Sequence, residues 1–303
     1  MKSKTLITIV GPTGIGKTRL SILLAQAFQT EIISCDSRQF YKEMTIGTAV
    51  PSEEELKAVK HHFIQNRSIL EDYSVGAFER DAIHLLSELF VTYDTVIMVG
   101  GSGLYVDAVT KGLDEFPKTD PGIRTMLNTR LENEGIATLQ EELKKLDPKS
   151  YDRIDLENKQ RLIRALEICI GSGKPFSHFI GISKKQRPFQ NIKIGISADR
   201  EVVYDRINQR VDAMIKSGLV DEARGLYQHR HLNALQTVGY RELFEYFDGK
   251  INLEFAIEEI KKNTRRFAKR QGTWFRRDKD ITWFDHTTDI SQIKDFLSIK
   301  VNP

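Results

Sequence analysis

The chain has 303 residues, of which 40% are hydrophobic and 29% charged, and its formal net charge of +3 says little about its partners. No apolar stretch approaches the length of a membrane span, and the N-terminus runs directly into a strand-like segment, so we expect a cytoplasmic protein with neither a signal peptide nor a membrane partner. The two cysteines, Cys35 and Cys169, are too few for a disulfide framework or a four-ligand zinc site.

The first predicted strand, 5–10, leads into the sequence GPTGIGKT at residues 11–18. Between a strand and a helix, this spacing predicts a loop whose backbone N–H groups cradle a phosphate at the positive end of the helix dipole. Lys17 would bridge the phosphate oxygens and the Thr18 hydroxyl would hold Mg²⁺. The loop alone does not distinguish ATP from another phosphate ligand. The predicted phosphate-binding residues are Gly11, Pro12, Thr13, Gly14, Ile15, Gly16, Lys17 and Thr18.

The second predicted strand, 31–35, ends at Asp36, on the rim where parallel sheets bind ligands. An aspartate at this place is also a common helix N-cap, so a structural and a functional interpretation both stay open. The next residues, Ser37, Arg38 and Gln39, extend a polar cluster along the same rim. The side-chain amide of Gln39 could read an adenine edge through two hydrogen bonds.

The third predicted strand, 95–99, ends in GGSGLY at residues 100–105. An NTPase usually has an acidic residue at the end of a second strand near Mg²⁺, and this segment contains none. A glycine-rich turn suits a ligand that approaches the backbone closely, with Ser102 as its polar group. The alternative is a plain turn in which Ser102 only caps the next helix.

The stretch from about 117 to 190 is predicted to form charged amphipathic helices without a strand. A fourth strand, 192–196, is followed by a helix that repeats apolar residues every four positions, with Asp199 as its N-cap. Arg206 and Arg210 lie four residues apart on this helix. They either reach the phosphate ligand or form a solvated basic face.

A last amphipathic helix is predicted to start near Leu253 and to continue into NTRRFAKRQGTWFRRDK, residues 263–279. Basic and aromatic residues alternate in this segment, which suits an RNA phosphate backbone but also a solvated face over core aromatics. They are Arg265, Arg266, Lys269, Arg270, Arg276 and Arg277, with Phe267, Trp274 and Phe275. Two adjacent histidines, His61 and His62, are predicted to be structural, because neighbouring side chains diverge and no third metal ligand stands nearby.

Together these elements predict an α/β fold. Residues 1–116 and 191–303 form a P-loop NTPase-like core, a parallel sheet with helices on both faces that ends in a basic helical part. Residues 117–190 form a helical insertion domain.

Eight segments together resemble the tRNA dimethylallyltransferases, or tRNA isopentenyltransferases, of bacterial type. They occur in the family's order and span nearly the whole chain: GPTGIGKT, DSRQFYKEMTIGTA, GGSGLY, NKQRLIRALEI, SGKPFS, RVDAMIKSGLVDEA, VGYRE and RRFAKRQGTWFRR. Three positions depart from the pattern: Val50 replaces a common lysine, Gln65 replaces an acidic residue, and YDRIDLEN replaces the usual turn at 151–158.

The resemblance implies that the loop holds the diphosphate of dimethylallyl diphosphate. The five-carbon group is transferred to the exocyclic N6 amine of the adenosine at tRNA position 37, which gives N6-dimethylallyladenosine and diphosphate. Asp36 matches the family's general base, and Ser102 matches a hydroxyl residue that touches the adenosine; with Lys17 they form the predicted catalytic set. Thr13 borders the reacting carbon, and Arg206 and Arg210 join the diphosphate site. Mg²⁺, held by Thr18, is the implied cofactor.

The resemblance also implies contact with the anticodon stem-loop of tRNA by a monomeric enzyme. The implied tRNA-binding residues are Asp36, Ser37, Arg38, Gln39, Ser102, Arg124, Gln160, Arg161, Leu162, Ile163 and Arg164. In physical terms, arginines of the insertion bind phosphates while a base leaves its stack to reach the carboxylate.

Three other functions remain open. A small-molecule or nucleotide kinase would place the loop on ATP, but it does not need the basic C-terminal run. An adenylate prenyltransferase would act on free nucleotides without tRNA. A P-loop RNA-binding protein would have no turnover to lose.

Overall fold

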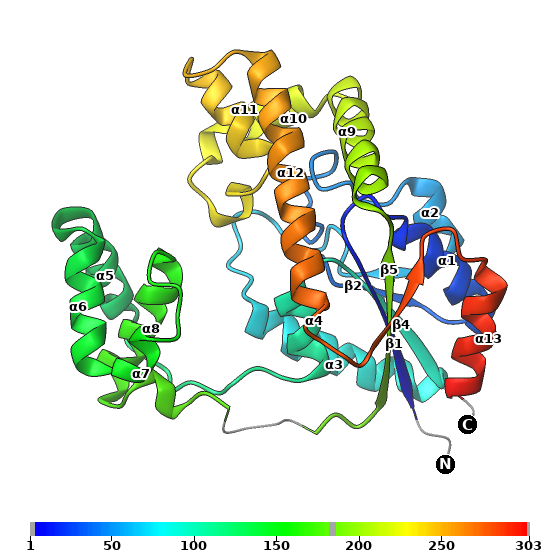
Figure 1. Ribbon diagram of the computed structural model, residues 1–303, viewed down its shortest axis with the longest axis horizontal. Coiled ribbons are helices and arrows are strands. Elements are labelled where there is room, and N and C mark those ends of the chain that lie inside the picture. The colour runs from blue at the N-terminus through cyan, green and yellow to red at the C-terminus, as the bar shows by residue number, and fades with distance from the viewer. Residues whose placement is uncertain (1–3, 182–185, 302–303) are drawn as a thin grey trace. The chain divides into compact units, whose positions relative to one another are not determined.

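The structure is a computed structural model that describes residues 4–181 and 186–301. The chain divides into two compact units (Figure 1). Met1–Thr110 and Arg187–Pro303 form the first, and Lys111–Gln186 form the second. The helical insertion was predicted at 117–190, so the second unit begins and ends slightly earlier than that range.

The first unit contains a six-stranded sheet in the order β3-β2-β4-β1-β5-β6. The strands are β1 (Thr5–Val10), β2 (Ile32–Ser34), β3 (His61–His62), β4 (Thr95–Val99), β5 (Gln190–Ser197) and β6 (Ile281–Asp285). Every neighbouring pair is parallel, and Ile7 at the centre pairs with Ile97 on one side and Ile192 on the other. The predicted parallel α/β fold is confirmed.

Both faces of the sheet are covered by helices, as predicted. On one face, Ile7 and Ile9 lie in a buried cluster with Leu24 of α1 (Lys17–Phe28) and Leu297 of α13 (Ile290–Val301). On the other face, the alternate residues of β1 pack with α3 (Val75–Thr92) and α4 (Gly103–Thr110). Successive strand residues point to opposite faces, and all six residues of β1 are buried, so this mostly apolar strand is covered on both sides.

A third cluster lies beyond the carboxyl ends of the strands, where α9 (Arg200–Lys216), α10 (Leu219–Leu226), α11 (Tyr240–Phe247) and α12 (Leu253–Phe275) pack together (Figure 1). Tyr41 and Met44, from the loop after β2, are buried in the same cluster. The short helices α2 (Glu53–Ala58), η2 (Tyr227–His229) and η3 (Asn233–Leu235) complete the unit. This packing fixes the loop after β2 against the helices at the rim of the sheet.

The C-terminal part of the chain differs from the prediction. The helix from Leu253 ends at Phe275, and it is followed by β6 and α13 rather than being the last element. Strand β6 is a short edge strand in which only Ile281 is buried, so it lacks the mostly apolar run that marks β1. Asp199 does occupy the N-cap position of α9, but its side chain makes no capping hydrogen bond.

The two histidines of β3 both make polar contacts within the chain. His61 Nδ1 lies 2.8 Å from the carbonyl oxygen of Val59, and His62 Nε2 lies 2.5 Å from Glu31 Oε2. Within the described ranges, no three His, Cys, Asp or Glu side chains are grouped so that they could hold a metal ion.

The second unit is a helical domain with its own core. Its elements are α5 (Pro121–Glu134), α6 (Ile136–Leu146), α7 (Pro148–Tyr151), α8 (Lys159–Ser172) and η1 (Phe176–His178). Leucines from three helices, Leu127, Leu143 and Leu162, are fully buried together. Asp120 caps α5 by accepting from the Gly122 N–H, and Asn158 caps α8 by accepting from the Arg161 N–H.

Candidate active site

Three polar segments meet at one rim of the sheet. The phosphate loop follows β1, Asp36 follows β2, and the GGSG turn of residues 100–103 follows β4. These strands are neighbours in the order β2-β4-β1 and are parallel, so their carboxyl ends lie side by side. The strand order reverses at β1, and ligands of open α/β sheets bind at such a switch point.

The phosphate loop has the geometry expected of an anion site. Gly16 caps α1 with a φ of 102°, a left-handed conformation that favours glycine. Lys17 Nζ donates to the carbonyl oxygen of Pro12 at 2.8 Å, so the ammonium folds back over the loop. Burial lowers the pKa of Lys17 to about 8; the negative charge of Asp36 opposes this, and the positive charge of Arg210 adds to it. A bound diphosphate would favour the charged ammonium.

A cavity of about 830 Å³, here called the phosphate-loop cavity, lies over this loop. Lys17, Thr18 and Asp36 line it, together with residues 48–52 from the loop that precedes α2. Its walls therefore combine anion-binding groups with the small apolar side chains of Ala49, Val50 and Pro51.

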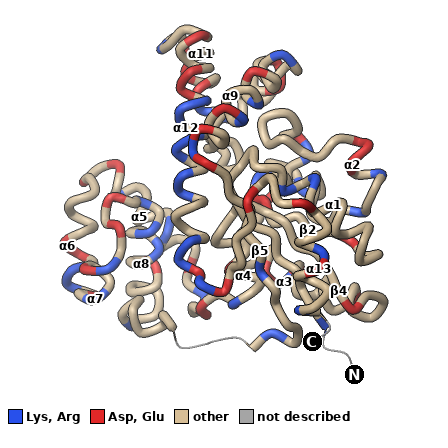
Figure 2. Tube along the Cα trace, turned by 45° about the vertical axis from the view of Figure 1, so that its right-hand side comes forward, with Lys and Arg blue, Asp and Glu red and all other residues tan. Residues whose placement is uncertain are grey.

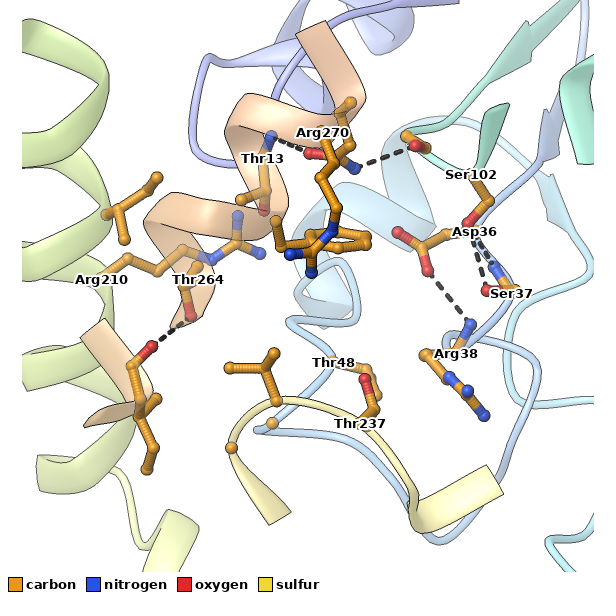
Figure 3. A pocket seen from close by; sticks show the side chains of 18 of the residues that line it. Thr13, Asp36, Ser37, Arg38, Thr48, Ser102, Arg210, Thr237, Thr264 and Arg270 are labelled. Carbon is orange, nitrogen blue, oxygen red and sulfur yellow. Dashed lines mark hydrogen bonds between the residues drawn. The ribbon is translucent and has the colours of Figure 1, made fainter. Parts of the chain in front are cut away.

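A second cavity of about 550 Å³, the α12 cavity, lies beside it. It is bounded by α9, α12, the GGSG turn and residues 236–241. The side chains of Asp36, Arg210 and Arg270 point into it from three sides (Figure 3). Five residues line both cavities: Thr13, Asp36, Thr48, Gly101 and Arg210. The two cavities thus meet at the carboxylate of Asp36.

Asp36 satisfies both interpretations of its place in the sequence. Its Oδ1 accepts a hydrogen bond from the Arg38 N–H at 3.1 Å, which closes a local turn as a capping residue would. The same side chain lines both cavities and is only partly buried. The turn fixes where the carboxylate points.

The hydroxyl of Ser102 accepts from the Ser37 N–H at 3.1 Å and lies 3.1 Å from the Ser37 hydroxyl (Figure 3). These bonds join the turn after β4 to the segment after β2. The first turn of α4 bonds to the backbone carbonyl of Ser102, through the N–H groups of Tyr105 and Val106. The side chain therefore faces the α12 cavity and Ser37, and the N–H groups of α4 bond to the backbone carbonyl of Ser102 rather than to its hydroxyl.

Arg206 and Arg210 do not form a solvated face. Arg206 lines the phosphate-loop cavity and donates to the carbonyl oxygen of Ile15 at 3.3 Å. Arg210 lines both cavities, and burial lowers its pKa while the charge of Asp36 opposes the shift. Two guanidinium groups thus reach the cavity that holds the phosphate loop.

The side chains of Arg38 and Gln39, which follow Asp36 in the sequence, donate hydrogen bonds to backbone carbonyls of this chain. The amide of Gln39 donates to the carbonyl oxygens of Thr48 and Ala49, and its oxygen lies 3.2 Å from the Ser34 hydroxyl. In this structure the amide of Gln39 thus holds the wall of the phosphate-loop cavity, and its contact with an adenine edge stays a prediction. Arg38 donates to the carbonyl oxygens of residues 233 and 234.

Among the predicted RNA-contacting residues of the second unit, some side chains are exposed and others are buried. Arg161 is exposed at the start of α8, as is Gln160. Leu162 and Ile163 are 0% and 3% exposed and belong to the core, so their predicted contact with tRNA is wrong. Consecutive residues of a helix point in different directions, so residues 160–164 of α8 do not all lie on one face.

Two of the three predicted arginines of the second unit, Arg124 and Arg164, converge on one buried carboxylate. Arg124 and Arg164 lie 3.3 Å and 3.1 Å from the two oxygens of Glu167. The side chain of Glu167 is 8% exposed, whereas those of the arginines are 48% and 38% exposed. Glu167 therefore holds two partly exposed guanidinium groups from different helices next to each other.

The basic run on α12 has a buried side and an exposed, basic side. Figure 2 shows lysines and arginines along the helix. Phe275 is buried in the core, whereas Phe267 is 39% exposed and lines the α12 cavity with Arg270. The indole of Trp274 donates to Asp107 Oδ2 at 2.9 Å. One face of the helix holds the core while the other remains basic.

The donor set around the phosphate loop fits Mg²⁺ that is shared with a diphosphate. Thr18 lines the phosphate-loop cavity next to Lys17 and supplies a hydroxyl oxygen. Mg²⁺ commonly keeps several waters and takes few protein ligands beside phosphate oxygens, so a complete carboxylate cage is not required.

Sequence reasoning missed several residues of the site. Thr237, Val238 and Arg241 line the α12 cavity, as does Gln271 from α12. None lies next to a predicted strand end, and VGYRE at 238–242 was noted only as a matching segment. The sequence signal for them is their place in or next to two segments: Thr237, Val238 and Arg241 belong to or adjoin VGYRE, and Gln271 lies within the basic run.

Comparison with known proteins places the chain in a family. The IPP transferase family pattern matches residues 39–278. The chain is 60% identical to a tRNA dimethylallyltransferase of Flavobacterium johnsoniae, over 97% of each chain, and 60% identical to one of Christiangramia forsetii, over 99% of each.

Two solved structures are similar over nearly the whole chain. The tRNA isopentenylpyrophosphate transferase of Bacillus halodurans is 39% identical, with a TM-score of 0.73 and coverage of 98% of this chain and 97% of the other. A eukaryotic dimethylallyltransferase acting on tRNA is 28% identical, with a TM-score of 0.80 and coverage of 98% and 77%. The parallel sheet with its phosphate loop, the match over residues 39–278 and these full-length relatives show that the chain belongs to the IPP transferase family.

Proposed function

We propose that this protein is a tRNA dimethylallyltransferase, which transfers a dimethylallyl group from dimethylallyl diphosphate to an adenosine of tRNA. The names of its full-length relatives support the activity. We further propose that the acceptor atom is the exocyclic N6 amine of the adenosine at position 37.

One observation carries this proposal: Asp36 lies where two cavities meet. The phosphate-loop cavity offers Lys17, Thr18 and the loop to a diphosphate. The α12 cavity offers Ser102 and the exposed ring of Phe267 to a nucleoside. A transferase needs its two substrates to touch at one point, with a proton acceptor beside that point.

The reaction then follows from the groups at the junction. The lone pair of the adenine N6 forms a bond to C1 of the dimethylallyl group while the C1–O bond to the diphosphate breaks. The electron pair of that bond leaves with the diphosphate, and the N6 proton passes to the carboxylate of Asp36. Adenine N6 is a weak nucleophile because its lone pair is delocalised, so a placed base contributes about 10²–10⁴-fold.

Charge on the departing diphosphate is stabilised by the phosphate loop. Its backbone N–H groups and the N-terminus of α1 face the anion, and Lys17, Arg206 and Arg210 bring positive charge to the same cavity. When bound, Mg²⁺ would neutralise part of the diphosphate charge, with the Thr18 hydroxyl as its protein ligand. Thr13 borders the reacting carbon, because it lines both cavities.

On the RNA side, we propose that Ser37, Ser102, Arg124, Gln160, Arg161 and Arg164 contact the anticodon stem-loop. Exposed arginines suit backbone phosphates, and the α12 cavity suits a base that has left its stack. We propose a monomer that works in the cytoplasm. None of the helices described here combines the length and apolar content needed to span a membrane.

The decisive experiment measures transfer of label from dimethylallyl diphosphate to an unmodified anticodon stem-loop, with Mg²⁺ and without ATP. The matched control is the same RNA without adenine at position 37. Label in the adenine-bearing RNA alone supports the proposal. Label transferred to free AMP or ATP without RNA would favour the adenylate prenyltransferase. ATP turnover with a small acceptor and no labelled RNA would favour the kinase.

A further inference from the structure

Gln271, on the last turns of α12, joins two loops that are distant in the sequence. The Thr13 N–H donates to Gln271 Oε1 at 2.9 Å, and Gln271 Nε2 donates to the carbonyl oxygen of Gly101 at 2.9 Å. These partners lie 258 and 170 residues away along the chain. Gln271 is 6% exposed, and a buried amide that uses both its ends in this way is held in one orientation.

Both partners of Gln271 belong to the junction of the cavities. Thr13 and Gly101 are among the five residues that line both of them. Gly101 directly precedes Ser102, whose hydroxyl bonds to Ser37. The single amide therefore bridges the phosphate loop and the turn that carries Ser102.

The space at Gly101 is shaped to this amide. A Cβ atom on Gly101 would lie 2.2 Å from Gln271 Nε2, which is closer than any real contact. Only a glycine lets the turn approach the amide this closely. A side chain at position 101 would therefore displace the Gln271 amide from its place between the two loops.

The helix that carries Gln271 is itself fastened on both sides of the α12 cavity. Toward α9, Lys261 pairs with Asp212 at 2.9 Å and Arg265 donates to Asn208 at 2.6 Å. Toward α4, the Trp274 indole donates to Asp107. The amide therefore projects from a rigid element, which is what precise placement of two loops requires.

We propose that Gln271 is a positioning residue that holds the phosphate loop and the GGSG turn at a fixed separation. With this spacing, Thr13 beside the diphosphate and Ser102 beside the adenosine face Asp36 at the same time. The inference rests on the proposed transfer reaction. A shift of about 1 Å in reacting groups can cost about 10²-fold in rate, while binding of each substrate on its own side changes little.

The first test replaces Gln271 with methionine, which has a similar length and no hydrogen-bonding amide. We expect Gln271→Met to lower kcat by about 10- to 100-fold, with KM for dimethylallyl diphosphate and for the stem-loop within about threefold of the wild-type values. The matched control is Asn263→Leu, which removes another side-chain amide of α12 that donates to Glu242 and lies outside both cavities. It should keep its kcat, with folding of both variants checked by circular dichroism.

A second test uses protonation to restore the amide's pattern. In Gln271→Glu, an ionised carboxylate can accept from Thr13 but cannot donate to Gly101, whereas a protonated carboxyl can do both. Burial raises the pKa of such a carboxyl. The ratio of the variant's kcat to that of the wild type should therefore rise as the pH falls from 8.5 to 6.

The outcomes separate the inference from the proposed function. If the wild-type enzyme transfers no label to the stem-loop, the proposed function fails before Gln271 is tested. If the wild type is active and Gln271→Met keeps its kcat, the positioning role is overturned. The same holds if Asn263→Leu loses as much kcat, if the losses of Gln271→Met are confined to KM, or if the pH ratio for Gln271→Glu is flat.

Discussion

One oxygen of the Asp36 carboxylate, Oδ1, closes the turn at Arg38 and so fixes the direction of the side chain. Structure and chemistry therefore depend on the same residue, and a substitution that removes the whole group would disturb both. An asparagine keeps an oxygen that can accept from the Arg38 N–H but cannot act as a base. This makes the base function separable from the turn.

We expect Asp36→Asn to lower kcat by about 10²–10⁴-fold, because the N6 proton then has no carboxylate to receive it. Affinity for the stem-loop should stay within about twofold, since the turn persists. Single-turnover transfer and filter binding measure the two quantities. A variant with undiminished kcat would remove Asp36 from the mechanism.

Lys17 gives a pH dependence of donor binding. Burial lowers the pKa of its ammonium to about 8, so the free protein loses this charge as the pH rises through that value. The diphosphate binds the charged form, and we expect its affinity to fall by up to about tenfold per pH unit above pH 8. Calorimetric titration with dimethylallyl diphosphate between pH 7 and 9.5 measures this.

The matched control for that experiment is Lys17→Arg, because a guanidinium stays charged over the whole range. Its affinity should be nearly independent of pH even if its absolute value is lower. Equal slopes in the wild type and in this variant would show that another group titrates.

At the scale of elements, different sides of α12 pack into the core, contact the loops of the site and line the α12 cavity. Ala268 and Phe275 pack into the core, Gln271 reaches the loops, and Phe267 and Arg270 face the α12 cavity. Because 3.6 residues complete a turn, one helix can present these groups in different directions from a short stretch of sequence. The basic run therefore concerns only part of the helix surface.

We expect Arg270→Ala to lower affinity for the stem-loop and to reduce the slope of log K against log salt by about one, as the loss of one phosphate contact predicts. The control is Lys300→Ala, which removes the same charge from an exposed position on α13, outside both cavities. Binding measured from 50 to 300 mM salt tests the pair. If both variants share the wild-type slope, Arg270 makes no contact with the RNA backbone.

Sequence patterns predicted the elements that are apolar throughout and missed those at the edges. Strands β1 and β4 are buried on both faces, so they read as continuous apolar runs. Strand β3 has two residues, and β6, at the sheet edge, has one buried residue, Ile281, among partly buried and exposed ones. Helix α13 was not predicted, because the helix from Leu253 was predicted to be the last element of the chain. In the structure α13 packs on α1.

At the scale of the whole molecule, the site is a product of topology. Residues 11–18, Asp36 and Ser102 could be predicted together because adjacent parallel strands end at one rim. Gln271 and the segment 236–241 could not, because they reach the rim from helices whose place is set by tertiary packing. Leu162 shows the opposite kind of error: the resemblance of its segment to the family predicted a contact with tRNA, but its side chain is buried in the core of the second unit.

The two units have separate cores, and this predicts a local effect of core substitutions. We expect Leu162→Ala to destabilise α5–α8 by about 2–5 kcal/mol, the usual cost of truncating a buried leucine. Hydrogen exchange of amides in α5–α8 should accelerate, while protection in β1, β4 and β5 stays as in the wild type. Equal acceleration in both units would show that they unfold as one.

The overlap of the two cavities at Thr13, Asp36, Thr48, Gly101 and Arg210 also bears on inhibition and resistance. A compound that links an adenosine to a diphosphate mimic through a five-carbon spacer would pass all five residues. A mutation there that excludes the compound also alters a wall on which both natural substrates depend. A compound confined to one cavity contacts many residues at which a mutation could give resistance without affecting the other substrate. A compound that bridges the overlap leaves few such residues.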